Sequence, residues 1–182
     1  MIKRGNKDRR TLMKITVLNG SPRKTNTTAM VEAFTEGAKE AGHEVEVLQV
    51  GRMKIAGCMA CEYCHTTGEG QCVQKDDWQK VQPAFEDCDM IVFATPIYYF
   101  TMTAQMEAAI QREYCIGKPP KATKAAMLLS SGSPGVYDGA IGQYKGFTAF
   151  TGIEDAGVIT AFGEENQSEA KMAEIREFAK NL

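Results

Sequence analysis

The 182-residue sequence lacks the glycine-rich signatures of the commonest nucleotide-binding proteins. It contains no G-x-x-x-x-G-K-[ST] motif, and no G-x-G-x-x-G motif follows its first apolar run. Those glycines let the backbone close around the phosphates of ATP or NAD. Their absence therefore disfavours ATP hydrolysis and a dinucleotide site of the Rossmann type.

The sequence also has few histidines, nearly balanced charges and no long apolar run. The two histidines, His43 and His65, offer no partner for a Ser-His-Asp catalytic set. The formal net charge of −2 gives no reason to expect nucleic acid binding. No apolar run reaches the ~20 residues of a membrane-spanning helix. We therefore expect no nucleic acid partner and no membrane attachment.

The first twelve residues differ in composition from the rest of the chain. They carry five basic side chains and one acid, and they contain no apolar segment like that of a secretory signal. We expect a disordered basic arm at 1–12 and a single domain at 13–182. Without a secretory signal, the cytoplasm is the expected location, and cysteine thiols stay reduced there.

Five short apolar runs alternate with five helical patterns along the domain. Such alternation is typical of a doubly wound α/β protein with a parallel sheet. Five strands favour the flavodoxin-like order 2-1-3-4-5, with ligands beyond the carboxyl ends of strands one, three and four. The expected strands are 14–19, 44–50, 89–95, 124–130 and 155–162, and the expected helices are 27–41, 76–88, 103–114, 140–151 and 168–182.

A polar loop follows the first strand and leads into the first helix. The first N–H groups of a helix have no internal partners and carry partial positive charge, so they attract anions. Hydroxyl groups and a guanidinium in the loop add further donors. The pattern predicts a phosphate site, although a βα turn that binds nothing would share it. The candidate side chains are Ser21, Arg23, Thr25, Thr27 and Thr28.

Residues 19–24 (N-G-S-P-R-K) and 26–27 (N-T) resemble the G-S-P-R and N-T opening of the NADPH-dependent FMN reductase family and its iron–sulfur flavoprotein relatives. Residues 95–99 (T-P-I-Y-Y) resemble the second flavin loop of that family. The resemblance implies a flavodoxin-like fold, FMN as the cofactor and NAD(P)H as the electron donor. It also implies that the FMN phosphate is held by Ser21, Arg23, Asn26, Thr27 and Thr28.

Residues 96–100 (P-I-Y-Y-F) follow directly after the third predicted strand. Aromatic residues dominate cores and interfaces alike, so simple packing would explain them. At the ligand edge of the sheet they would instead form a floor for a flat flavin ring, with backbone N–H groups near its polar edge. The loop after the fourth strand would close the third side. The predicted contacts are Pro96, Ile97, Tyr98, Tyr99, Phe100, Ser131, Gly132 and Tyr137.

Four of the six cysteines lie within 15 residues, in a C-x2-C-x2-C-x7-C pattern. The first three spacings match the tight chelate of [4Fe–4S] ferredoxins. A compact motif of this kind also marks the iron–sulfur flavoprotein branch that the chain resembles. Zinc usually prefers two separated C-x2-C pairs, and free redox-active thiols would hold no metal, so three interpretations stay open. The predicted ligands are Cys58, Cys61, Cys64 and Cys72.

The remaining candidates are assigned structural roles. We expect His65 at the surface, and we expect Cys88 and Cys115 to be buried in helices as small apolar residues. Asp76 and Asp77 fit the N-cap of the second helix better than an acid pair.

Three functions follow from these motifs. The first is an enzyme in which FMN passes electrons from NAD(P)H to a flavin, a quinone or another acceptor, with no side chain acting as acid or base. The second is an electron carrier with FMN, a [4Fe–4S] cluster and a ferredoxin-like partner. The third is a flavodoxin-like module with structural zinc. We expect the first of these functions. The family resemblance also implies that the protein assembles as a homodimer or homotetramer.

Overall fold

A computed structural model describes residues 12–182 of the chain. The predicted basic arm at 1–12 therefore lies, apart from Leu12, outside the described residues. Among the helices of the described part, none is long and apolar enough to cross a membrane.

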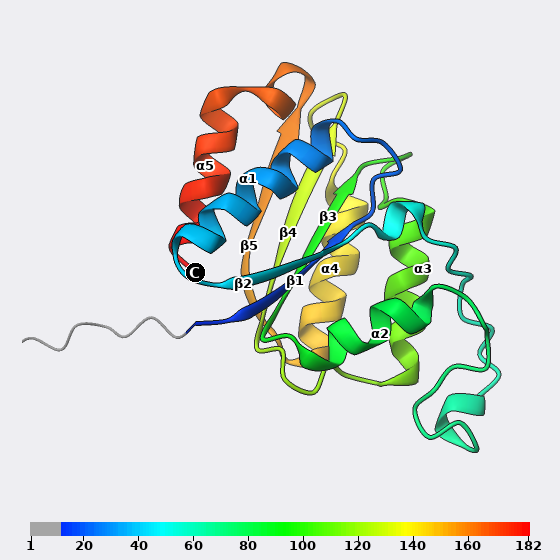
Figure 1. Ribbon diagram of the computed structural model, residues 1–182. Helices are drawn as coiled ribbons and strands as arrows, with labels where there is room; N and C mark the ends of the chain where they lie inside the picture. Colours follow the sequence, from blue (N-terminus) through cyan, green and yellow to red (C-terminus); the bar gives the residue numbers. More distant parts are fainter. Residues whose placement is uncertain (1–11) are drawn as a thin grey trace, which may run out of the picture.

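Five parallel strands form one sheet in the order β2-β1-β3-β4-β5, which confirms the predicted flavodoxin-like topology (Figure 1). The register places Leu18 of β1 between Leu48 of β2 and Phe93 of β3. Because all five strands are parallel, their carboxyl ends meet at one edge of the sheet. The strands are β1 (Lys14–Asn19), β2 (Glu44–Leu48), β3 (Met90–Pro96), β4 (Lys124–Ser131) and β5 (Glu154–Phe162).

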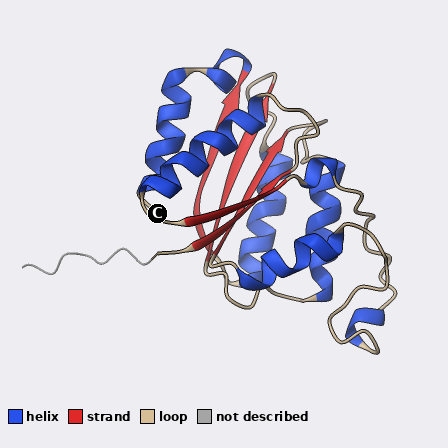
Figure 2. Ribbon diagram, viewed as in Figure 1, coloured by secondary structure: helices blue, strands red, loops and turns tan. Residues whose placement is uncertain are grey.

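Five α-helices cover the two faces of the sheet (Figure 2). The first and last helices pack together on one face, and the other three cover the opposite face. The helices are α1 (Asn26–Glu40), α2 (Trp78–Asp87), α3 (Ala104–Arg112), α4 (Asp138–Thr151) and α5 (Glu169–Lys180).

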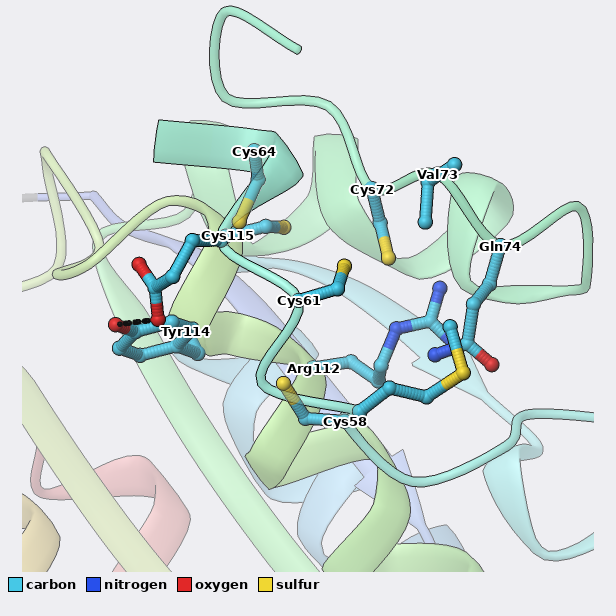
Figure 3. A pocket seen from close by; sticks show the side chains of 11 residues that line it. Cys58, Cys61, Cys64, Cys72, Val73, Gln74, Arg112, Tyr114 and Cys115 are labelled. Carbon is cyan, nitrogen blue, oxygen red and sulfur yellow. Dashed lines mark hydrogen bonds between the residues drawn. The ribbon is translucent and has the colours of Figure 1, made fainter. Parts of the chain in front are cut away.

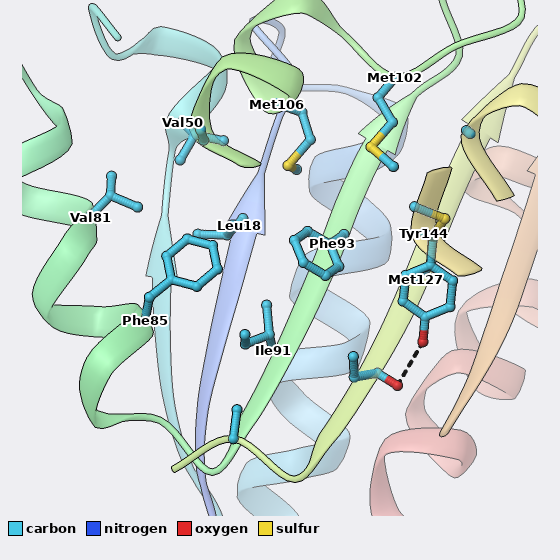
Figure 4. Packing of buried hydrophobic residues seen from close by; sticks show 14 of the residues in the cluster. Leu18, Val50, Val81, Phe85, Ile91, Phe93, Met102, Met106, Met127 and Tyr144 are labelled. Carbon is cyan, nitrogen blue, oxygen red and sulfur yellow. Dashed lines mark hydrogen bonds between the residues drawn. The ribbon is translucent and has the colours of Figure 1, made fainter. Parts of the chain in front are cut away.

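Each face of the sheet has its own apolar core because alternate residues of a strand point to opposite sides. Along β3, Val92 packs toward α1 and α5, whereas Ile91 and Phe93 pack toward α2, α3 and α4 (Figure 4). Burial on both sides explains why β3 and β4 read as continuous apolar runs in the sequence. The two cores fix the positions of the loops at the carboxyl edge.

The structure differs from the expected elements mainly around the cysteines. Strand β2 ends at Leu48 rather than at residue 50, because the chain turns into a 3-10 helix at Val50–Arg52. Cys88 lies just after α2, and Cys115 lies in a 3-10 turn, so neither occupies the α-helix predicted for it. Both are nevertheless buried, as expected.

The two aspartates at the start of α2 share the predicted capping role. Asp77 occupies the N-cap position, but its carboxylate accepts no capping hydrogen bond from a backbone N–H of the helix. Its carboxylate instead accepts the N–H of Lys54 at 2.8 Å and pairs with Lys80. Asp76 supplies the bond to the helix by accepting the N–H of Trp78 at 3.1 Å.

Candidate flavin and cysteine sites

The loops after β1, β3 and β4 come together at the carboxyl edge of the sheet. They line a partly open cavity of about 180 Å³, to which the segment after β5 also contributes. Residues predicted from all three loops line it, so the structure brings together segments more than a hundred residues apart. The lining residues are Arg23, Asn26, Pro96, Ile97, Tyr98, Ser130, Ser131, Gly132, Gly163 and Asn166.

The N-terminus of α1 opens onto this cavity. Thr25 occupies its N-cap position without making a side-chain hydrogen bond to the helix, and the first turn contains no acidic residue. The N–H groups of that turn are therefore available to an anion. Arg23 is exposed beside them, and Asn26 is held by a hydrogen bond of 2.9 Å from Gln167.

Three predicted hydroxyl groups already have partners within the protein. Ser21 Oγ accepts the N–H of Arg23 at 3.2 Å and donates its own hydrogen to the Arg23 carbonyl oxygen at 3.0 Å. Thr27 Oγ1 lies 2.7 Å from Ser130 Oγ, and Thr28 Oγ1 donates to the Arg23 carbonyl at 3.2 Å. These three hydroxyls therefore shape the loop, and the backbone N–H groups, the Thr25 hydroxyl and Arg23 are left as donors for a ligand.

Two residues that sequence reasoning missed hold the loop from behind. Thr103, at the N-cap of α3, donates its hydroxyl to the carbonyl of Gly20 at 2.9 Å. A Cβ atom at Gly51 would lie 2.4 Å from the Ser21 carbonyl carbon, so only glycine fits there. Neither contact has a local sequence signal, because each pairs segments that are distant in the chain.

The aromatic loop forms a tight turn. Tyr98 and Thr101 exchange backbone hydrogen bonds of 3.0 and 3.3 Å, while Tyr99 and Phe100 between them have φ angles of 52° and 72°. Such left-handed backbone costs about 1–3 kcal/mol for each non-glycine residue. Gly139 makes the turn possible, since a Cβ there would lie 2.5 Å from the carbonyl oxygen of Phe100.

The turn divides the predicted ring contacts into two groups. Pro96, Ile97 and Tyr98 line the cavity itself. Tyr99 and Phe100 point outward, 97% and 59% exposed, and border a neighbouring depression of about 190 Å³. The continuous aromatic floor expected from the sequence is therefore limited to its first three residues within this chain.

The third side of the cavity is built around Ser131. Its hydroxyl lies 2.7 Å from that of Tyr137, which also donates to the Ala161 carbonyl at 3.1 Å. Tyr137 is thus buried behind the wall and supports Ser131. Asn166, which sequence reasoning missed, donates to the carbonyls of Ser131 and Gly163 at 2.8 and 2.9 Å.

The chemistry of the cavity fits a phosphorylated flavin. The uncapped helix and Arg23 suit a phosphate, and Pro96 with Ile97 offers an apolar surface to a flat ring. Asn166 is 1% exposed, and its Oδ1 has no hydrogen-bond partner among the residues that the structure describes. Because a buried, unpartnered acceptor is costly, this atom suits a donor on a bound ligand.

The cysteine segment lies away from this cavity, beyond the C-terminal end of α3 (Figure 1). Its cysteines are gathered around one pocket (Figure 3). Ala60 and Glu62, on either side of Cys61, have φ angles of 51° and 58°, so the backbone reverses twice within a few residues. The residues lining the pocket are Cys58, Met59, Cys61, Glu62, Cys64, Cys72, Val73, Gln74, Arg112, Tyr114 and Cys115.

All four predicted ligands are free thiols. Cys58 and Cys61 are exposed, whereas Cys64 and Cys72 are half-buried. Burial raises the pKa of Cys64, and neighbouring cysteines add to the shift. Within the described residues, no group of three His, Cys, Asp or Glu side chains is arranged to hold a single metal ion.

Asp76 and Asp77 anchor the cysteine segment to the fold. Asp76 Oδ2 accepts the N–H of Ala56 at 3.0 Å and one guanidinium nitrogen of Arg112 at 2.6 Å. Burial tends to raise the pKa of Asp76, but its hydrogen bonds from Arg112, Ala56 and Trp78 outweigh that and hold it below the ordinary value.

His65 and Tyr114 lie at the rim of the cysteine pocket. His65 is exposed, as expected, and packs edge-on against Tyr114 with ring centroids 4.7 Å apart. Tyr114 donates its hydroxyl to Glu62 at 2.9 Å.

The fifth cysteine of the pocket, Cys115, was not predicted there. Its burial raises its pKa to about 11, so it stays a neutral thiol.

A parallel sheet of this order, with an uncapped helix and an aromatic turn at its carboxyl edge, defines a flavodoxin-like protein of the flavin-binding class. The sequence model of NADPH-dependent FMN reductase matches residues 13–163. The chain therefore belongs to that family, and this membership confirms the predicted FMN cofactor.

Curated relatives carry a more particular name. An iron–sulfur flavoprotein of Archaeoglobus fulgidus is 37% identical over 100 residues, which are 55% of this chain and 48% of that protein. An iron–sulfur flavoprotein of Methanosarcina thermophila is 33% identical over 113 residues, or 62% of this chain and 58% of that protein. The chain thus spans about half the length of the curated relatives it matches.

Solved structures share the fold at lower identity. An NAD(P)H:quinone oxidoreductase from Methanothermobacter marburgensis has a TM-score of 0.70 at 20% identity, covering 94% of this chain and 97% of that one. An FMN-dependent NADH-azoreductase from Bacillus anthracis str. Ames Ancestor, in complex with FMN, has a TM-score of 0.67 at 15% identity, covering 92% and 98%.

Proposed function

We propose that the protein is an FMN-dependent oxidoreductase that takes electrons from NAD(P)H and passes them to a flavin, a quinone or another acceptor. The observation that carries this proposal is the cavity at the carboxyl edge. The uncapped N-terminus of α1 and the Pro96–Tyr98 segment both border it. Membership of the FMN reductase family and the oxidoreductase names of the similar structures support it.

Each side of the cavity has a distinct role in this proposal. The first-turn N–H groups of α1 and the Arg23 guanidinium bind the phosphate, while the hydroxyls of Ser21, Thr27 and Thr28 keep the loop in shape. Pro96, Ile97 and Tyr98 pack on one side of the ring. Ser131 and Gly132, supported by Tyr137, approach it from the other loop, and Tyr99 and Phe100 cover the outer edge.

The protein supplies placement rather than acid–base chemistry. Of the residues that line the cavity in the described part of the chain, none is an aspartate, glutamate or histidine. Bound FMN supplies hydride acceptance and the release of electrons singly or in pairs. The protein residues orient the ring, exclude water from one side and set its polar contacts.

We further propose a [4Fe–4S] cluster as the occupant of the cysteine pocket, with Cys58, Cys61, Cys64 and Cys72 as its ligands. The iron–sulfur flavoprotein names of the relatives and the C-x2-C-x2-C spacing support this. Zinc would draw its thiolates to about 2.3 Å from one point. A cubane takes one thiolate on each of four irons, which suits cysteines spread around a pocket (Figure 3).

The cluster makes an electron carrier the second candidate function. In that case single electrons pass between FMN, the cluster and a ferredoxin-like partner, with no pyridine nucleotide site. We also propose a cytoplasmic location for either function, because thiolate ligands need a compartment that keeps cysteines reduced. We also propose a homodimer or homotetramer, because Tyr99 and Phe100 are exposed beside the cavity.

Anaerobic purification and reconstitution test these proposals. We expect an absorption spectrum with the bands of oxidised flavin plus a broad shoulder from the cluster, and we expect NADPH to bleach the flavin rapidly. Bleaching by dithionite and reduced ferredoxin but not by NADPH or NADH would select the electron carrier. A preparation that binds no FMN when FMN is added would refute both functions.

Two variants separate the sites. Cys61→Ser should lose the shoulder and keep FMN, whereas Arg23→Gln should weaken FMN binding and keep the shoulder. Arg52→Gln is the matched control for Arg23, because its guanidinium donates to the Pro22 carbonyl of the same loop at 3.3 Å and Arg52 does not line the cavity. Bound zinc in place of iron, measured by elemental analysis after reconstitution with both metals, would contradict the cluster assignment.

A further inference from the structure

Arg112 is the last residue of α3, and its side chain is buried at the base of the cysteine pocket. It is only 1% exposed, which is rare for a group that is always charged. Among the pocket-lining residues in the described part of the chain, it is the only cation. A buried cation of this kind requires compensation by anions and acceptors.

One side of the guanidinium is fully engaged. Nη1 donates to Asp76 Oδ2 at 2.6 Å and to the carbonyl of Ala56 at 3.0 Å. The Trp78 ring lies beneath the group, with its centroid 5.9 Å from Cζ. Asp76 is fixed in turn by the N–H groups of Ala56 and Trp78, so this side holds the guanidinium in one orientation.

The other side of the guanidinium faces the Cys72 thiol, which helps to raise the pKa of Arg112. Nε and Nη2 are both buried, and neither has a partner in good hydrogen-bond geometry among the described residues. Figure 3 shows the guanidinium pointing into the pocket near Cys72. Burial opposes the charge, but the Asp76 bond and the nearby Asp76 and Cys72 groups raise the pKa of Arg112 above its ordinary value. Leaving charged donors unpaired costs more than leaving neutral ones, so these N–H groups indicate a missing anionic acceptor.

We propose that Arg112 is the electrostatic partner of the cysteine site, and that its Nε and Nη2 groups donate hydrogen bonds to sulfur atoms of a thiolate-bound iron–sulfur cluster. The inference rests on the proposed cluster and extends it beyond the four cysteines. Arg112 acts as a positioning residue in this role: Asp76 and Trp78 orient it, and it neutralises part of the negative charge of the site.

This role has two measurable consequences. Hydrogen bonds and positive charge near the sulfurs stabilise the reduced, more negative state, so Arg112 raises the reduction potential. It also slows the loss of iron, because loss of a supporting partner around a metal site typically costs 10–100-fold in affinity. Lysine in its place keeps the charge but loses the planar fork of donors.

The test compares Arg112→Gln, Arg112→Lys and wild type after anaerobic reconstitution. Arg176→Gln is the matched control, because it makes the same chemical change on α5, on the opposite face of the sheet. Potentials are measured by dithionite titration followed by EPR, and iron release is timed with a chelator. We expect a lower potential and about 10-fold faster iron loss in Arg112→Gln, with Arg112→Lys between it and wild type.

A second measurement needs no variant and so does not depend on whether Arg112→Gln folds. Wild-type protein labelled with ¹⁵N-arginine is reduced, and pulsed EPR should detect guanidinium nitrogen coupled to the cluster. Potentials and iron-release rates equal to those of Arg176→Gln, with no arginine coupling, would overturn the role of Arg112 while leaving the cluster in place. Wild type that takes up no iron would instead overturn the proposed cluster, and the role of Arg112 with it.

Discussion

At the scale of single residues, burying a polar group without a hydrogen-bond partner costs free energy of folding. Glu113 is such a group: it is 4% exposed, its Oε1 has no partner in the described part of the chain, and burial raises its pKa to about 8. The group follows Arg112 directly but lines an apolar groove beside Phe147 and Phe150, on the other side of the turn.

Glu113 should make stability depend on pH. Its carboxyl is protonated in the native state up to about pH 8, whereas in the unfolded chain it ionises near 4.5. The unfolded state therefore binds fewer protons in this window, and stability is lost as pH rises from 4.5 to 8, by at most about 1.4 kcal/mol per pH unit. Glu113→Gln should remove that loss, as measured by urea unfolding across the window.

The exposed Glu164 provides the control for this prediction. Glu164→Gln should follow the pH profile of the wild type. An unchanged gap in stability between Glu113→Gln and wild type at all pH values would show that Glu113 is ionised in the native protein.

The stability of the protein should depend on which residue replaces Asn166. Its amide holds two carbonyl groups, those of Ser131 and Gly163. Asn166→Ala removes both of these bonds and should cost about 1–3 kcal/mol, with weaker FMN binding. Asn166→Asp places acceptor against acceptor and should cost more. Urea unfolding and FMN titration measure the two effects, and an Asp variant as stable as wild type would contradict this geometry.

At the scale of elements, the Tyr98–Thr101 turn stores strain beside the cavity. Type I′ turns require positive φ at both central positions and prefer Asn-Gly there, yet this chain has Tyr99 and Phe100. Strained backbone near a candidate site suggests that the side chains were retained for binding rather than for stability.

Replacing the turn with its preferred residues tests this interpretation. Tyr99→Asn combined with Phe100→Gly should stabilise the protein by about 1 kcal/mol, raising Tm by roughly 2–4 °C, because the strain is relieved. The same change should weaken FMN binding or acceptor reduction, measured by titration and steady-state kinetics. A more stable variant with unchanged binding and kinetics would show that the aromatic rings serve another purpose.

At the scale of the whole molecule, the cavity exists only when the sheet is assembled. Its lining comes from loops after four different strands, so a ligand that bridges them binds the folded state and not the unfolded chain. FMN at a free concentration about 100 times its Kd should stabilise the protein by about 2.7 kcal/mol. The expected rise in Tm is roughly 5–10 °C.

Riboflavin is the natural control for that measurement because it has the same ring without the phosphate. It should raise Tm much less than FMN, since it cannot use the N-terminus of α1 or Arg23. Equal shifts in differential scanning calorimetry would place the phosphate elsewhere, and Arg23→Gln should then respond to FMN as wild type does.

The sequence by itself determined the strands, their order and which loops meet at the carboxyl edge, where the candidate site lies. Buried parallel strands are written as continuous apolar runs, and the strand order fixes which loops share an edge. The phosphate loop, the Pro96–Tyr98 segment and the four clustered cysteines were all local patterns. Each carried its chemistry in the spacing of a few neighbouring residues.

Only the tertiary structure decided which side chains complete these patterns. Thr103 reaches Gly20, Asn166 reaches Ser131, and Arg112 reaches Asp76 across 83, 35 and 36 positions of the chain. No local propensity encodes such pairs, because the packing of helices on a sheet sets them. For the same reason the outward direction of Tyr99 and the unpaired N–H groups of Arg112 became visible only once the chain was folded.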